Sequence, residues 1–198
     1  MIFKKEHELL RKAVREFVER EMADYPEEVD VTGTIPEDVR LKLAKYKFSS
    51  PVVPAEYGGA GADYVSYVII MEEISRRCAS TGTIVTAATS LVALPLINFG
   101  NEEQKQKYLK PLALGEQIGC FALTEPGAGS DAGASQTTAV LDGDEWVLNG
   151  RKTFITNAPI CDFAIVSAMT DKSKGTHGGM STFIVESNLE GFSVGAHE

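Results

Sequence analysis

The chain has 198 residues, of which 43% are hydrophobic and 24% charged, a composition typical of globular proteins with one or two domains. Its formal net charge of −9 argues against nucleic-acid binding, because a phosphate backbone requires a footprint of lysine and arginine. This charge still allows a phosphorylated small molecule, which backbone N–H groups and a few local cations can hold.

The cysteines and the N-terminus indicate a cytoplasmic protein. The cysteines are odd in number, widely spaced and outside any metal-ligand pattern, as expected of reduced thiols: Cys78, Cys120 and Cys161. The histidines are scattered and predict no metal cluster: His7, His177 and His197. The N-terminus MIFKKEHELL is charged and amphipathic, unlike a signal peptide, and no apolar run approaches the length of a membrane span.

The first half of the sequence predicts helices. Apolar residues recur at steps of three and four between Glu8 and Met22 and form one apolar face. Pro36 can open a second helix, and PAEYGGAG, residues 54–61, is typical of a loop because it is rich in helix breakers. Asp63 stands where it can cap a third helix, which continues through residue 80.

Two more helices are predicted before residue 117. The stretch Thr83–Ile97 is nearly uncharged, which predicts a buried helix. Asn101 followed by Gln104 resembles a capping box and opens a polar helix through Lys107. Residues 1–117 are therefore predicted to form an all-α domain.

The pattern changes near Gly119, where apolar runs shorten and β-branched residues increase. Asp142-Gly143 and Asn149-Gly150 are hairpin signals on either side of Trp146-Val147-Leu148. Further strands are predicted at Thr153–Thr156, Phe163–Ala168, Ser181–Val185 and Phe192–Val194. Helices followed by strands predict an α+β protein, with an antiparallel β domain over residues 118–198. Only four residues follow the last predicted strand, so this β domain is expected to be incomplete.

The most informative stretch is ALTEPGAGSDAGA, residues 122–134. Gly127, Gly129 and Gly133 let the backbone turn tightly around Ser130 and Asp131 and aim several N–H groups at one point. Such a nest suits an anion such as a pyrophosphate. An ordinary surface connection is the alternative interpretation of the glycines alone.

A second stretch, LNGRKTFITNA, covers residues 148–158. Phe154 and Thr156 would point to the same side of a strand, where a ring and a hydroxyl could flank a planar cofactor. A half-buried edge strand gives the same pattern.

These two stretches, together with PAEYGGAG and FGNEEQKQKYLKPLALGE, resemble the acyl-CoA dehydrogenase family in their sequence and in their order along the chain. The resemblance covers essentially all 198 residues. It implies an N-terminal helical domain and a middle β domain, with FAD as the cofactor. AMTDKSKGTHGG and GRKTFITNAPICD look closest to anaerobic bacterial short-chain and arylacryloyl-type members.

The resemblance also implies roles for individual residues around FAD. The isoalloxazine ring would be lined by Phe121, Leu123 and Thr124, with Thr124 hydrogen-bonded to it. Ser130 would reach the pyrophosphate, helped by neighbouring backbone amides such as that of Gly129. Phe154 would pack beside the flavin, where many members have tryptophan, and Thr156 would bond near the reactive nitrogen.

For the substrate, the resemblance implies an acyl pocket lined by Ala87, Ala88 and Leu91. Ser130 is also implied to bind substrate, and Thr170 matches a position near the CoA moiety. The resemblance implies that Glu125 belongs to the loop and not to catalysis. Family members are nearly twice as long, and a second helical domain supplies their catalytic glutamate, so no catalytic residue is assigned here.

The implied activity is FAD-dependent α,β-dehydrogenation of an acyl-CoA thioester, or the reverse reduction of an enoyl-CoA. Electrons would pass to an electron-transferring flavoprotein, and the full-length protein would be a homotetramer. Two alternatives stay open from the sequence. One is a non-catalytic or split-enzyme protein that binds flavin or CoA, and the other is an acyl-CoA oxidase, which shares the flavin motifs but reduces oxygen.

Overall fold

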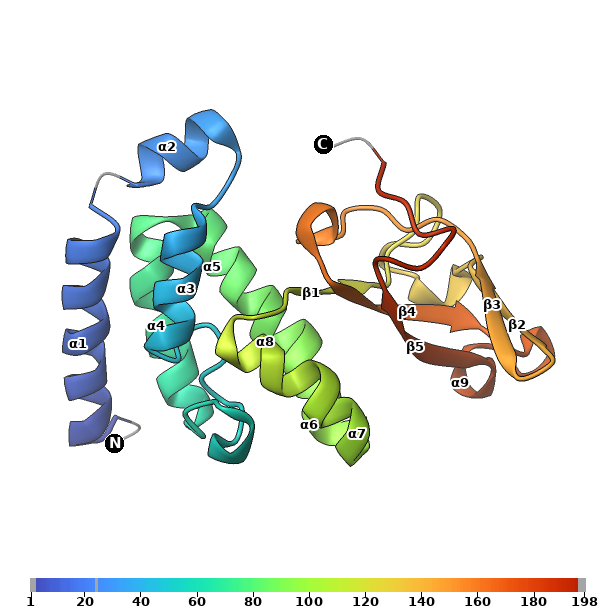
Figure 1. Ribbon diagram of the computed structural model, residues 1–198, viewed down its shortest axis with the longest axis horizontal. Coiled ribbons are helices and arrows are strands. Elements are labelled where there is room, and N and C mark those ends of the chain that lie inside the picture. The colour runs from blue at the N-terminus through green and yellow to red at the C-terminus, as the bar shows by residue number, and fades with distance from the viewer. Residues whose placement is uncertain (1–2, 24, 196–198) are drawn as a thin grey trace. The chain divides into compact units, whose positions relative to one another are not determined.

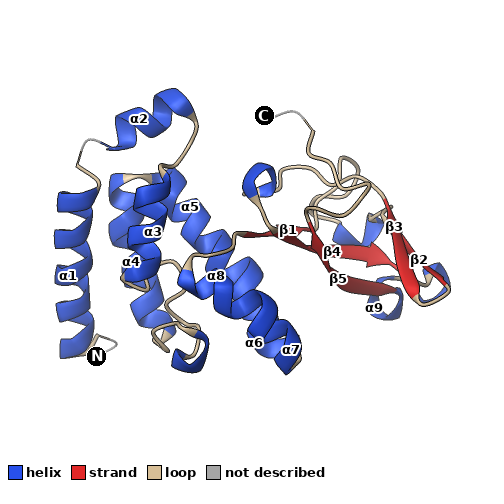
Figure 2. Ribbon diagram, in the orientation of Figure 1, coloured by secondary structure: helices blue, strands red, loops and turns tan. Residues whose placement is uncertain are grey.

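The computed structural model describes residues 3–23 and 25–195, and the chain divides into two compact units, Met1–Gln117 and Ile118–Glu198 (Figure 1). The first unit is helical and the second is built around a β-sheet (Figure 2). The predicted order of a helical domain followed by a β domain is therefore confirmed. Residues 196–198, at the end of the predicted incomplete domain, and with them His197, lie outside the described residues.

The helical unit is held together by the apolar face of its first helix. Helix α1 (Lys5–Glu21) buries Val14, Phe17 and Val18 against α4 (Tyr64–Arg77), which contributes Ile70 and Ile74 to the same core. Burial of one such large aliphatic or aromatic side chain contributes about 1.5–3 kcal/mol. The predicted amphipathic helix is thus confirmed.

The helix predicted from Pro36 is α3 (Glu37–Lys45), and α2 (Tyr25–Thr32) was not predicted. Helix α2 has the sequence YPEEVDVT, and only Tyr25 and Val29 are buried in it. Two apolar positions in eight residues give too little periodicity to detect a helix from sequence.

The predicted helix starts are confirmed at both capping sites. The carboxylate of Asp63 accepts a hydrogen bond of 2.8 Å from the backbone N–H of Ser66, which fixes the first turn of α4. Asn101 and Gln104 form the reciprocal capping box, with bonds of 2.8 and 3.0 Å. The helices that follow are α7 (Glu102–Gln104), the π-helical η3 (Lys105–Leu109) and α8 (Lys110–Leu114).

The nearly uncharged segment is one long helical run. It consists of α5 (Ala79–Thr86), the π-helical η2 (Ala87–Ala93) and α6 (Leu94–Phe99). The sequence predicted no apolar run of membrane length, yet an 18-residue window within residues 79–99 has a mean hydropathy of 1.6, and by length and composition only this helical run could cross a membrane. Packing explains part of this apolar character, since Val85, Val92 and Leu96 are buried in the helical unit.

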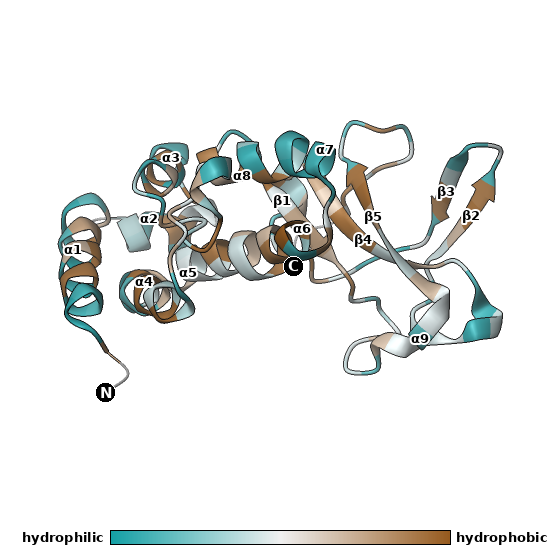
Figure 3. Cartoon of the chain, turned by 90° about the horizontal axis from the view of Figure 1, so that it is seen from below, coloured by the Kyte–Doolittle hydropathy of each residue, from teal (hydrophilic) through white to brown (hydrophobic). Residues whose placement is uncertain are grey.

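The second unit contains a five-stranded sheet centred on β4 (Phe163–Met169), which is buried along most of its length and coloured as hydrophobic in Figure 3. Strand β4 pairs with β5 (Met180–Glu186) in antiparallel orientation and with β1 (Gly119–Ala122) in parallel orientation. Strand β2 (Thr138–Asp142) forms a hairpin with β3 (Glu145–Asn149) and touches the end of β4. The short helix α9 (Thr176–Gly179) precedes β5.

The sheet is mixed, which corrects the prediction of a wholly antiparallel domain. The antiparallel pairs are β2 with β3 and β4 with β5, and each pair is close in sequence. Strands β1 and β4 are separated by the intervening hairpin and loops, and the chain returns to run alongside β1 in the same direction.

The hairpin at Asp142 is confirmed, with Gly143 at φ +61° in its two-residue turn. The hairpin predicted at Asn149-Gly150 was wrong. A Cβ on Gly150 would lie 2.3 Å from Thr137 Oγ1, so the glycine allows a close approach of two segments instead of a turn.

Two predicted strands are irregular backbone. Residues 153–156 form no ladder, because Phe154 adopts φ +55° and ends any extended conformation there. Residues 192–194 also lie outside the strands of the sheet. The remaining short 3₁₀ turns are η1 (Ala55–Tyr57), η4 (Ala132–Ala134), η5 (Ala158–Ile160) and η6 (Lys172–Lys174).

Candidate functional site

The glycine-rich segment after β1 folds back on itself before it opens to solvent. Glu125 and Ala128 exchange two backbone hydrogen bonds of 3.1 and 3.0 Å, which close a tight turn. The next three residues, Gly129, Ser130 and Asp131, are exposed. In the described part of the chain, their backbone N–H groups donate to no acceptor. A Cβ on Gly129 would meet nothing within 4 Å, so these N–H groups border open space of the kind an anion can occupy.

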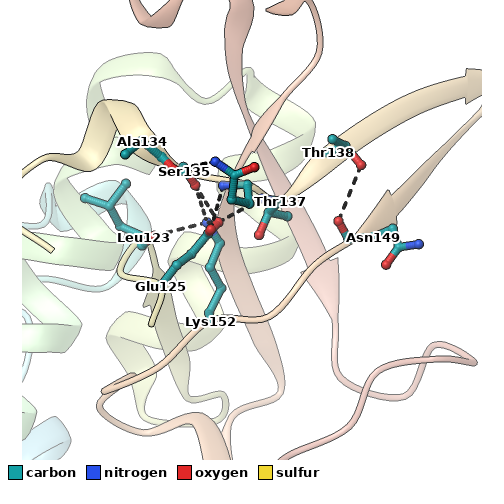
Figure 4. A network of polar contacts seen from close by, with 9 residues as sticks. Leu123, Glu125, Ala134, Ser135, Thr137, Thr138, Asn149 and Lys152 are labelled. Atoms are coloured by element: carbon teal, nitrogen blue, oxygen red, sulfur yellow. Dashed lines mark hydrogen bonds and ion pairs between the residues drawn. The ribbon is translucent and has the colours of Figure 1, made fainter. Parts of the chain in front are cut away.

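A buried ion pair between Glu125 and Lys152 anchors the start of this segment (Figure 4). The side chains of Glu125 and Lys152 are 5% and 10% exposed, and Lys152 Nζ lies 2.8 Å from Glu125 Oε1. The same ammonium donates to the backbone carbonyl of Leu123 at 3.0 Å and contacts Ser135 Oγ at 3.3 Å. These three acceptors match the three N–H donors of a lysine ammonium.

Glu125 accepts further hydrogen bonds from the chain that leads into β2. The backbone N–H groups of Gln136 and Thr137 donate at 2.6 and 3.0 Å, and the hydroxyl of Ser135 donates to Oε1. Burial by itself opposes ionisation of Glu125, but the hydrogen bonds from Lys152, Ser135 and Thr137 outweigh it and hold the pKa of this carboxyl well below its usual range. Glu125 is therefore an ionised, fully engaged group.

The segment after β3 lies beside the end of β1. The backbone N–H of Thr153 donates to the carbonyl of Thr124 at 2.9 Å. Phe154 follows with φ +55° and a side chain that is 75% exposed. A bulky residue in the left-handed region is rare and strained, and such strain concentrates at functional sites. Asn157, also left-handed at φ +70°, is buried.

The structure brings the residues predicted around the cofactor into one unit. The half-buried residues lie on β1 and directly after it: Phe121, Leu123 and Thr124. The exposed residues lie on the two neighbouring segments: Gly129, Ser130, Phe154 and Thr156. The Thr153–Thr124 hydrogen bond joins the segment of Phe154 to that of Thr124.

The residues predicted to contact substrate are dispersed over both units. Thr170 follows β4, and its hydroxyl donates to the Gly179 carbonyl at 2.9 Å and lies 3.1 Å from Ser181 Oγ. In η2, Ala87 is buried at 3% exposure and belongs to the core of the helical unit. Its neighbours on η2, Ala88 and Leu91, are half-buried and exposed.

Sequence reasoning missed Lys152. In the sequence, Arg151-Lys152 has the appearance of two solvated cations beside a turn. Only the fold places Lys152 against Glu125, which is 27 positions earlier in the chain. The one available signal was Glu125 itself, since a carboxylate in an apolar glycine-rich loop needs a partner when it is buried.

Comparison with known proteins follows the two units. Residues 4–116 match the acyl-CoA dehydrogenase N-terminal domain, and residues 120–198 match the acyl-CoA dehydrogenase middle domain. The chain belongs to the acyl-CoA dehydrogenase family. The resemblance inferred from the sequence motifs is thereby confirmed.

Several bacterial acyl-CoA dehydrogenase relatives are similar to this chain over nearly its whole length. A 3-(aryl)acrylate reductase of Clostridium sporogenes is 52% identical over 100% of this chain. A short-chain specific acyl-CoA dehydrogenase of Clostridium acetobutylicum is 50% identical over 98% of it. The caffeyl-CoA reductase–Etf complex subunit CarC of Acetobacterium woodii is 47% identical over 100% of it. The chain spans about half the length of these curated relatives, 52%, 51% and 52% respectively.

Solved acyl-CoA dehydrogenase structures share the fold. Butyryl-CoA dehydrogenase from Megasphaera elsdenii matches with a TM-score of 0.88 and 37% identity, over 96% of this chain and 51% of that one. A glutaryl-CoA dehydrogenase from Mycobacterium smegmatis in complex with FADH2 matches with a TM-score of 0.87 and 31% identity, over 96% and 48% of the two chains.

Proposed function

We propose that this chain is the flavin-binding part of an enzyme that dehydrogenates an acyl-CoA thioester between its α and β carbons, or reduces the corresponding enoyl-CoA. The proposal rests on two observations in one unit: Phe154 is exposed and strained directly after the residue that is hydrogen-bonded to Thr124, and the N–H groups of residues 129–131 border open space. An exposed aromatic ring and an anion nest in one unit fit the two ends of FAD. A relative of the same fold forms a complex with FADH2.

The residues present fit this cofactor in two places. Gly129 and Ser130 would hold the pyrophosphate, since their N–H groups border open space and a larger residue at Gly129 would project into it. The isoalloxazine ring would lie against Phe121, Leu123, Thr124, Phe154 and Thr156, the apolar and hydroxyl-bearing residues of the adjoining segments. FAD would supply hydride transfer, and the protein positions and tunes it.

The same geometry excludes Glu125 as the base that removes the substrate α-proton. A general base must be free to accept a proton at the reacting atom. Glu125 is buried, is paired with Lys152 and accepts hydrogen bonds from three successive residues, 135–137. We propose that the base belongs to a part of the full-length protein outside residues 1–198, since the curated relatives are about twice as long.

We further propose short-chain or aryl-acryloyl thioesters of CoA as substrates, an electron-transferring flavoprotein as the electron partner, a homotetramer and a cytoplasmic location. The similarity to an arylacrylate reductase and a short-chain dehydrogenase supports the substrate class. The similarity to a subunit of a caffeyl-CoA reductase–Etf complex supports the electron partner. Ala88 and Leu91 would line the acyl pocket with Ala87 behind them, and Ser130 and Thr170 would lie near CoA.

The test is anaerobic titration of the FAD-loaded full-length protein with butyryl-CoA, crotonyl-CoA and an aryl-acryloyl-CoA, followed in the visible spectrum. Bleaching of the oxidised flavin by butyryl-CoA, or reoxidation of reduced flavin by either enoyl-CoA, is expected. A flavin indifferent to all three thioesters would sink the proposal. Rapid reoxidation of the substrate-reduced flavin by oxygen would instead identify an acyl-CoA oxidase.

A further inference from the structure

The buried Glu125–Lys152 pair joins three separate pieces of backbone. Lys152 Nζ binds the carbonyl of Leu123 at the end of β1, and Glu125 binds the backbone N–H groups of residues 136 and 137 that lead into β2. The third piece is the segment that carries Lys152 itself. Within the described residues, the other hydrogen bond between this segment and the end of β1 is the one from the Thr153 N–H to the Thr124 carbonyl.

The groups around Glu125 require a carboxylate at position 125 and a cation at position 152. Lys152, Gln136 N–H and Thr137 N–H all donate to Glu125, and none of them can accept. A glutamine at position 125 would point an NH₂ group at one of these donors. An uncharged residue at position 152 would leave a buried carboxylate without its counter-charge, which is strongly unfavourable.

Lys152 of this pair is close in sequence to the strained residue of the site. Phe154 is two residues after Lys152, and it holds φ +55° with a 75% exposed ring. A bulky residue in the left-handed conformation is strained and persists only where its neighbours are fixed. The two residues before Phe154 are both held by hydrogen bonds. The Lys152 ammonium donates to the carbonyl of Leu123, and the Thr153 N–H donates to the carbonyl of Thr124.

We propose that Lys152, paired with Glu125, is a positioning residue that sets the place of Phe154 and Thr124 against the isoalloxazine ring. The inference rests on the proposed flavin site. Lys152 acts through the backbone and not on the substrate, because its three N–H donors are engaged by protein acceptors. Its effect should therefore appear in the orientation of the bound flavin and not only in the stability of the unit.

The experiment compares Lys152→Met with wild type in the full-length chain, each titrated with FAD and then saturated with it. Lys152→Met is expected to weaken FAD binding at least tenfold and to change the visible circular dichroism of the bound flavin, which reports how the ring sits. The stability control is Ile184→Ala. Ile184 is half-buried on β5 and paired with Ile165, and β4 separates it from β1. This control should unfold at a lower urea concentration than wild type, with an unchanged flavin signal.

If Lys152→Met does not fold, Lys152→Arg replaces it. A guanidinium keeps the charge but presents a planar fork that cannot reproduce the ammonium contacts with all three acceptors. A smaller change of the flavin signal in the same direction is then expected. A folded position-152 variant with wild-type affinity and wild-type flavin dichroism would overturn the inference alone. Wild type that binds no FAD at micromolar concentration would overturn the proposed function as well.

Discussion

Among the described residues, each unit buries one carboxylate against cations, and the surroundings of the two carboxylates differ. In the helical unit, Glu73 of α4 is 1% exposed and receives hydrogen bonds of 2.8 and 2.9 Å from Arg15 and one of 2.9 Å from Arg11, both on α1. Arg76 adds a contact at 3.5 Å. In the β unit, Glu125 has Lys152 as its counter-charge, and backbone N–H groups and a hydroxyl supply its other bonds.

The surroundings of the two carboxylates differ because Glu73 joins regular helices and Glu125 binds irregular backbone. Glu73 joins two regular helices, whose backbone hydrogen bonds are made within each helix, and its arginines remain 30–50% exposed. Glu125 fixes irregular backbone, which has no ladder of its own and must bond to side chains instead. Several partly exposed arginines are sufficient to hold two helices together at Glu73. A single buried lysine at Glu125 instead fixes one geometry of the irregular backbone.

The largest expected effect is that of Lys152→Met on stability. The substitution leaves the Glu125 carboxylate buried without its counter-charge, and the free energy of unfolding of the β unit should fall by about 3 kcal/mol. Urea unfolding followed by Trp146 fluorescence measures this unit alone, because Trp146 on β3 is the only tryptophan in the sequence.

The matched control is Lys174→Met, which removes a lysine from an exposed pair with Asp171 in the same unit. It should change the free energy of unfolding by less than about 0.5 kcal/mol. Equal losses for the two variants would show that the burial of the Glu125–Lys152 pair has no energetic consequence.

Acid should act on the helical unit through Glu73. Hydrogen bonds from Arg15 outweigh burial and lower the pKa of Glu73 to about 2. A carboxylate whose folded pKa is depressed stabilises the fold above its unfolded pKa of about 4.3, and this contribution is lost as the pH falls toward 2. We expect a loss of about 2 kcal/mol between pH 5 and pH 3, measured by urea unfolding followed by far-ultraviolet circular dichroism. Glu73→Gln should flatten this dependence, and an equally steep dependence in the variant would contradict the assignment.

Arg15→Met should cost clearly less stability than Lys152→Met, because Arg11 and Arg76 still face Glu73 and Arg15 is already 48% exposed. Unfolding of the helices in urea, followed by far-ultraviolet circular dichroism, measures the loss. A loss as large as 3 kcal/mol would show that the arginines do not substitute for one another and that the contrast between the two units is false.

The smallest effect is expected for Lys12→Met. Lys12 pairs with Glu16 one turn away on α1 at 3.8 Å, and both side chains are more than 60% exposed. The change in the free energy of unfolding should stay within about 0.5 kcal/mol by the same far-ultraviolet measurement. This variant measures the effect of losing a solvated cation on the free energy of unfolding, and the effect of Arg15→Met is compared with it.

Much of the helical unit and the hairpin could be predicted because their signals are local. The apolar face of α1, the Asp63 cap of α4 and the Asn101–Gln104 capping box depend on residues three or four positions apart. The Asp142-Gly143 turn depends on neighbours in sequence. The family resemblance likewise rested on short contiguous motifs.

The sequence by itself therefore determined the order of the two domains, most helix starts, one hairpin and the family. Tertiary structure alone decided that β1 runs parallel to β4, that Lys152 is buried on Glu125, and that Phe154 leaves the extended conformation. The physical reason is the distance along the sequence between the interacting residues. A cap or a turn is satisfied within one turn of chain, whereas a buried charge and a strained backbone depend on partners that only the complete fold brings within hydrogen-bonding distance.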